Sequence, residues 1–109
     1  MMKINDKEYT WNKVYEPDKG EHGCFYVVKA IDNYYDFNRG PVSFVANIFS
    51  GAVAALEDMK AYDYDTFDDS ILEDIVADFE NNGEYTNPDN DKYTYCIEAI
   101  NIWKVEEVG

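Results

Sequence analysis

Alternating apolar and polar positions at the start of the chain predict a short β-hairpin. In the segment MMKINDKEYTWNKVY, Asn5 and Asp6 form the turn, and aromatic residues alternate with polar ones along the second strand. A loop with proline, glycine and charged residues follows at 16–23. Residues 24–32, CFYVVKAID, are β-branched and aromatic, which predicts a central strand.

Two later segments have the spacing of amphipathic helices. Apolar residues recur every three or four positions over 41–62, and the Gly-Pro pair at 40–41 suits a helix start. The first part, VSFVANIF, also fits a strand followed by a shorter helix that Ser50 caps, but we favour a helix throughout. A second helix is predicted over about 67–82, where an apolar stripe ends at the Asn-Asn-Gly sequence of 81–83.

The remaining segments complete an α+β pattern. Residues 84–92, EYTNPDNDK, are rich in turn formers and predict a loop, and 93–105 predict a long, mostly buried final strand. The order β-β-β-α-α-β predicts a small antiparallel β-sheet of about three to four strands, with two α-helices packed on one face. A chain of 109 residues is long enough for one core, so we expect a single domain over 1–109.

Charge is the most unusual feature of the composition. The net charge of −14 exceeds the magnitude of about 2–8 that keeps a small domain soluble. Residues 1–55 have a net charge of only −1, whereas 57–91 hold thirteen acids against Lys60, a net of −12. Because 46% of the residues are apolar and 17% aromatic, we expect a folded chain rather than a disordered one.

Several function classes are disfavoured. Direct binding of nucleic acid or of an anionic membrane needs clustered Lys and Arg, which this chain lacks. No apolar run has the length of a signal peptide or a membrane span, so we expect a cytoplasmic protein. Cys24 and Cys96 lie in strand-like runs, and we expect them to be buried free thiols rather than a disulfide.

The sequence predicts no catalytic residue and no cofactor. His22 stands two residues before Cys24, and such a pair can act as base and nucleophile. No third group is placed to orient the histidine, so the pair is better interpreted as a loop histidine beside a strand cysteine. Nucleophile-elbow and phosphate-binding glycine motifs are absent from the sequence.

A weak calcium-loop pattern gives one alternative. Side chains with oxygen donors occupy positions 1, 3, 5 and 12 of an EF-hand-like loop, but Lys92 stands at the sixth position, where a glycine makes the turn. We interpret this spacing as chance in an acidic chain, and no metal site is predicted. The four residues concerned are Asn87, Asp89, Asp91 and Glu98.

The acidic stretch around the second predicted helix is the candidate binding surface. On a helical wheel its carboxylates form two rows beside the apolar stripe, and like charges at i and i+4 cost a few tenths of a kcal/mol per pair. Over 65–80 they recur about every 3.4 Å of helical rise, close to the phosphate spacing of one DNA strand. The competing interpretation is a solvated acidic face. The predicted partner-binding residues are Asp63, Asp65, Asp68, Asp69, Glu73, Asp74, Asp78, Glu80 and Tyr64, with Tyr62, Phe67 and Tyr85 as further aromatic anchors.

In size and charge pattern the chain resembles DNA-mimic inhibitors, small acidic proteins of phages and mobile elements that block restriction or CRISPR nucleases. The resemblance implies a basic nucleic-acid-binding protein, a nuclease, as the partner. No sequence motif is shared, so no residue takes a role from it. Two alternatives stay open: an immunity protein that neutralises a basic toxin and, in a different class, a small divalent-cation-binding protein.

Overall fold

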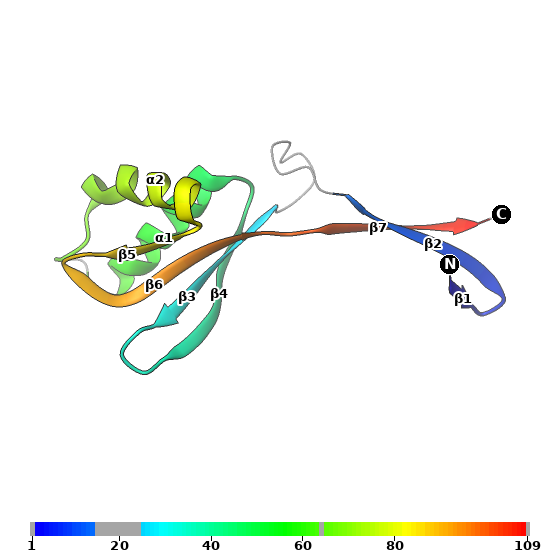
Figure 1. Cartoon of the computed structure of the whole chain (residues 1–109), viewed down its shortest axis with the longest axis horizontal. Coiled ribbons are helices and arrows are strands. Elements are labelled where there is room, and N and C mark those ends of the chain that lie inside the picture. Colours follow the sequence, from blue (N-terminus) through cyan, green and yellow to red (C-terminus); the bar gives the residue numbers. More distant parts are fainter. Residues whose placement is uncertain (1, 15–24, 64, 109) are drawn as a thin grey trace.

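The structure, a computed structural model, describes residues 2–14, 25–63 and 65–108 and is elongated (Figure 1). It measures 59 × 30 × 22 Å, and its radius of gyration is 17.8 Å, against about 13 Å for a compact domain of this length. The described residues form seven strands and two α-helices, which confirms the α+β class. A head with both helices (residues 25–101) continues into a projecting three-stranded arm (residues 2–14 and 102–108).

The arm begins with the predicted hairpin. Asn5 and Asp6 have φ angles of 51° and 67°, which a two-residue turn with both central residues in the left-handed region requires. The strand order is β1-β2-β7, and all pairs are antiparallel. The strands are β1 (Met2–Ile4), β2 (Lys7–Val14) and β7 (Ile102–Val108).

The head is a four-stranded antiparallel sheet with both helices on one face, as the sequence predicts. The opposite face is mixed, with Val27 and the exposed Phe44 on the same side as the Lys29–Glu98 ion pair, at 2.9 Å. The strand order is β4-β3-β6-β5. The elements are β3 (Tyr26–Asp32), β4 (Phe37–Val45), α1 (Ile48–Tyr62), the 3₁₀ turn η1 (Asp69–Ile71), α2 (Leu72–Asn82), β5 (Glu84–Asn87) and β6 (Asn90–Ala99).

The core lies between this sheet and the two helices. Val28, Ile75 and Tyr95 are its largest fully buried side chains. Helix α1 approaches the sheet closely at Gly51, where an added Cβ would lie 2.5 Å from the Cδ1 atom of Ile97. Close packing of this kind fixes the position of α1 on the sheet, and therefore also the outer surface that α1 and α2 form together.

The prediction of a helix over 41–62 is wrong in its first part. Strand β4 continues to Val45, and α1 starts only after Asn47, whose side chain accepts a hydrogen bond from the Ser50 amide at 2.8 Å. The Ser50 hydroxyl accepts one in return from the Asn47 amide, at 3.1 Å. This reciprocal cap fixes the helix start. Gly40, with φ +83°, lies inside β4 rather than at a helix entry.

Other boundaries also differ from the sequence prediction. Residues 84–92 are not a loop, because β5 and the start of β6 pair there as a hairpin. The predicted final strand over 93–105 divides at residues 100–101, where the chain leaves the head sheet and enters the exposed arm as β7. The second helix starts as η1 at Asp69 and stops as predicted at Gly83, which has φ 72°.

Some predictions lie partly or wholly outside the described residues. The predicted loop at 16–23, with His22, and the residue Cys24 belong to this part of the chain. Cys96 is a free thiol as expected, but it is half-buried rather than buried. No helix in the described ranges is long and apolar enough to cross a membrane.

Candidate protein-binding site

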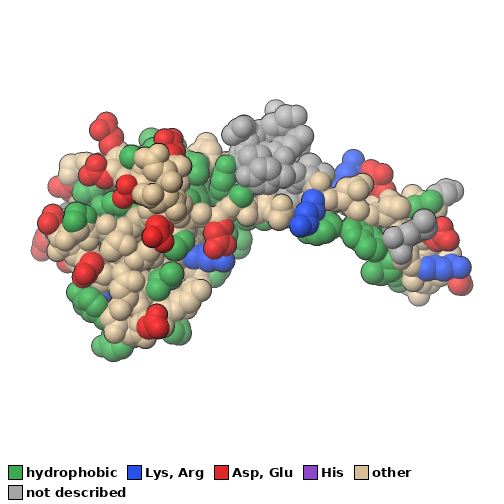
Figure 2. Space-filling model, in the orientation of Figure 1, with side chains coloured by type: hydrophobic (Ala, Val, Ile, Leu, Met, Phe, Trp, Pro, Cys, Tyr) green, Lys and Arg blue, Asp and Glu red, His purple; other side chains and the backbone are tan. Residues whose placement is uncertain are grey.

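The predicted binding residues lie on the helix-bearing side of the head. Acidic side chains are spread over the head surface (Figure 2), and most of the predicted set are exposed, whereas Asp63 and Asp78 are half-buried. Tyr64 lies outside the described residues. The exposed members are Asp65, Asp68, Asp69, Glu73, Asp74 and Glu80.

Two of these acids stabilise the connection between the helices. Asp63 accepts hydrogen bonds from the amide and the hydroxyl of Thr66, at 3.2 and 2.6 Å, and from Asn90 at 3.3 Å. Asp68 caps η1 by accepting from the hydroxyl and the amide of Ser70, and these bonds lower the pKa of Asp68. Both residues therefore have a local structural role, which explains the presence of a carboxylate at these positions without any binding partner.

Lys60 partly compensates the acidic surface, which the linear sequence did not indicate. Its ammonium group, on α1, forms an ion pair with Asp69 at the start of η1 and lies 3.8 Å from Glu57. By contrast, no ion pair is found for Glu73, Asp74, Asp78 or Glu80 within the described ranges. All four acids of α2 therefore lack an ion pair in the described ranges, as do acids outside the helix such as Asp65, Glu84 and Asp89.

An apolar groove of about 370 Å³ lies beside α2 and is framed by two of these carboxylates. Glu73 and Glu80, one from each end of the helix, line it together with the exposed ring of Phe49 from α1. Leu72, Val76 and Ala77 complete the lining. An apolar floor with acidic ends suits a protein segment that has an apolar side chain between Lys or Arg residues.

The continuous row of charges predicted over 65–80 is shorter in the structure. Helix α2 has 11 residues, which is about 16 Å of rise, and residues 65–68 precede the 3₁₀ turn. Of the two rows of carboxylates on the helical wheel, Asp69, Glu73 and Glu80 on one side and Asp74 and Asp78 on the other, all but Asp69 lie on α2. Glu73 and Glu80 border the groove, whereas Asp74 and Asp78 lie on the side of Tyr85. Burial raises the pKa of Tyr85, and the charges of Asp74 and Asp78 raise it further.

Two of the predicted aromatic anchors are wrong, whereas Tyr62 is exposed as an anchor would be. Phe67 and Tyr85 belong to the core, so neither is available to a partner. Exposed aromatic rings occur instead at the turn between β3 and β4, on Tyr34, Tyr35 and Phe37. The signal for them was present in the sequence as NYYDF, which has no apolar periodicity and adjoins turn residues.

A partly buried polar cluster connects β4, α1 and β6. Arg39 donates to Asp58 at 3.0 Å and to the Tyr62 hydroxyl at 2.6 Å, and its guanidinium lies over the Tyr62 and Tyr93 rings, 4.5 and 4.9 Å from their centroids. The hydroxyl of Tyr95 donates to the same Asp58 carboxylate. Arg39 has no ladder partner on β3, because a β-bulge places Ala30 opposite Gly40 and Ile31 opposite Asn38. The bulge directs Arg39 out of the regular alternation.

Two buried tyrosines make stability fall at high pH. Burial raises the pKa of Tyr95, as does its bond to Asp58, and burial also raises the pKa of Tyr85. A raised pKa in the folded state favours the neutral phenol, so this stability is complete below about pH 10 and lost as pH rises toward the folded pKa. We expect the urea midpoint to fall above about pH 10, and to fall less steeply in Tyr95→Phe. Tyrosinate absorbance measures how many tyrosines have ionised. Ionisation of all ten tyrosines while the protein is still folded would contradict this expectation.

The described residues supply no arrangement for metal chemistry. They contain no group of three or more His, Cys, Asp or Glu that could hold an ion. The EF-hand-like stretch is the β5–β6 hairpin, in which Asn87 ends one strand and Asp91 and Glu98 belong to the next. Extended strands do not wrap around an ion as a calcium loop does.

Comparisons with known proteins leave the site without a precedent. No family model, no curated protein and no solved structure matches this chain.

Proposed function

We propose that this chain is a non-enzymatic inhibitor of the DNA-mimic type. Its acidic head binds the basic nucleic-acid-binding groove of a nuclease, in the manner of an anti-CRISPR or anti-restriction protein, and excludes the nucleic acid. The observation that carries the proposal is the pair Glu73 and Glu80, exposed at the two ends of an apolar groove and without an ion pair in the described part of the chain.

Charge segregation supports the head as the binding part. Residues 25–101 hold sixteen acids and four bases, a net charge of −12, whereas the arm ranges 2–14 and 102–108 hold four of each. A field of one sign over one part of a molecule speeds encounter with an oppositely charged surface and is screened by salt. Capture should therefore be fast at low salt and weaken as salt rises.

The first test is capture from a lysate of bacteria that express a CRISPR or restriction nuclease, repeated with excess duplex DNA. We expect the nuclease to be retained on the immobilised chain and released by DNA, because both ligands need the same Lys and Arg side chains. Retention that DNA does not change, or no retention of the nucleases tested, would count against the decoy role.

The groove favours one second candidate, an immunity protein for a basic toxin. A groove of about 370 Å³ with an apolar lining can select one side chain of one partner, which charge alone does not do. An immunity protein should bind a single toxin very tightly and ignore unrelated nucleases. A DNA mimic should bind several nucleases, each in competition with DNA.

A further inference from the structure

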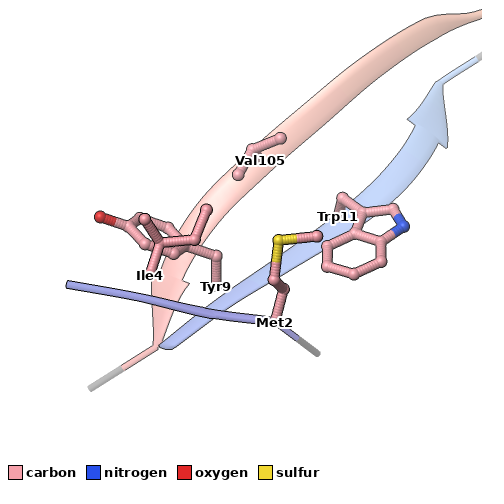
Figure 3. Close-up of a pocket in the computed structure, with 5 residues that line it drawn as sticks. All are labelled: Met2, Ile4, Tyr9, Trp11 and Val105. Carbon is pink, nitrogen blue, oxygen red and sulfur yellow. The ribbon is translucent and has the colours of Figure 1, made fainter. Parts of the chain in front are cut away.

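One face of the arm, called the apolar face below, carries most of its large apolar side chains together with Lys7, Lys13 and Glu107, whereas the other face is mainly polar. The strand register places Trp11 opposite Val105, and Lys13 opposite Trp103, so both tryptophans lie on the same side of the sheet. Met2, Ile4 and Tyr9 extend this side at the tip, around a pocket of about 340 Å³ (Figure 3). The other side carries polar residues, which include Glu8, Thr10, Asn12, Lys104 and Glu106.

The apolar face of the arm is uncovered in the described structure. Trp11, Trp103 and Val105 are 39%, 53% and 60% exposed, and Tyr9 is half-buried. Both helices pack on the head sheet, away from the arm (Figure 1). A sheet with one apolar face is stable when that face packs against another layer, so the arm needs a covering surface.

Charge makes a second copy of this chain the fitting cover. The arm ranges have no net charge, whereas the head has −12, so two copies can approach at their arms with the least like-charge repulsion. Area is also sufficient. The face has six large apolar side chains, which are Met2, Ile4, Tyr9, Trp11, Trp103 and Val105. Covering them removes on the order of 500 Å² of accessible surface per copy and about 1,000 Å² per pair, the lower limit of stable interfaces.

We propose that two copies of this chain associate through the apolar faces of their arms. The two arms run antiparallel about a two-fold axis, which places the acidic heads at opposite ends and leaves their grooves free. The contact is isologous, because each copy offers the same face. This pairing uses the arm and is independent of the inhibitor function proposed for the head.

The test uses the two tryptophans, which are the only ones in the chain and both lie in the arm face. Diluting the protein through the micromolar range should shift tryptophan emission to the red and increase acrylamide quenching. Sedimentation over the same concentrations should show a change from dimer to monomer, since an interface near 1,000 Å² supports about micromolar affinity. Added salt should not weaken this dimer, although it weakens capture by the head.

Matched variants locate the contact. Val105→Lys places a charge opposite Trp11 within the apolar face and should give a monomer at every concentration. Thr10→Lys adds the same charge on the polar face, opposite Glu106, and should stay dimeric. A monomeric wild-type chain at about 100 µM, open-ended growth in mass, or a dimer that Val105→Lys leaves unchanged would overturn the proposal. Should Val105→Lys not fold, the dilution of the wild-type chain still decides.

Discussion

Reversing Glu73 and Glu80 to lysine is expected to weaken binding of the head to its basic partner by about 100-fold, or close to 3 kcal/mol. Each reversal removes an attraction at one end of the groove and introduces a repulsion there. The fold should tolerate both changes, because the two side chains are exposed and make no ion pair in the described ranges. Glu73→Lys near the start of α2 costs a few tenths of a kcal/mol through the helix dipole, and Glu80→Lys near the end of the helix offsets that cost.

A matched control separates the groove from total charge. Glu84→Lys with Asp89→Lys changes the net charge by the same amount, but both residues lie at the β5–β6 hairpin, outside the groove. We expect this control to slow association while most of the affinity remains. Equal losses in the two double variants would show that overall charge, not the groove, governs binding. An unchanged affinity in the groove variant would end the proposed site.

Replacing Asp58 by alanine is expected to lower the free energy of unfolding by about 3 kcal/mol. The change leaves the partly buried Arg39 without its carboxylate and the hydroxyl of the fully buried Tyr95 without its acceptor. The side chains of Arg39 and Asp58 are only 20% and 17% exposed, so water replaces the lost bonds poorly. Urea unfolding measures the effect.

The direction of the stability change in Asp58→Ala distinguishes the loss of these specific bonds from an effect of overall charge repulsion. Removing any acid from a chain of net charge −14 relieves repulsion, which alone would stabilise the fold. Glu80→Ala removes the same charge at an exposed position and should leave stability within about 0.5 kcal/mol of the wild type. A loss below about 1 kcal/mol in Asp58→Ala would mean that the cluster contributes little. Adding Arg39→Met should recover part of the loss, because no unpaired charge then remains.

Several local signals in the sequence predicted local structure correctly, although the Gly-Pro pair at 40–41 and the turn formers of 84–92 did not. The turn at Asn5 and Asp6, the stop at Gly83 and the apolar stripe of α2 each depend on neighbouring residues only, and each is found in the structure. The start of α1 was missed because pairing of β4 with β3 competes with helix formation, and that pairing is not visible in a single segment.

The site was less predictable than the fold because its contacts are long-range. Lys60 and Asp69 lie on different elements, and the sequence argument therefore treated the stretch as uncompensated. Asp58 counted as one more repelling acid, although a bulge in β4 brings Arg39 to it from 19 positions away. Phe67 and Tyr85 flank the acidic stretch in the sequence, but position along the chain does not tell an interface ring from a core ring, and both rings are buried.

The most direct measurement is the apparent Kd between this chain and the captured nuclease in the presence of increasing duplex DNA that the nuclease recognises. A decoy for the nucleic-acid groove competes with DNA, so the apparent Kd should rise in proportion to free DNA, and no ternary complex should form. A constant apparent Kd, with chain and DNA bound to the nuclease together, would contradict the account.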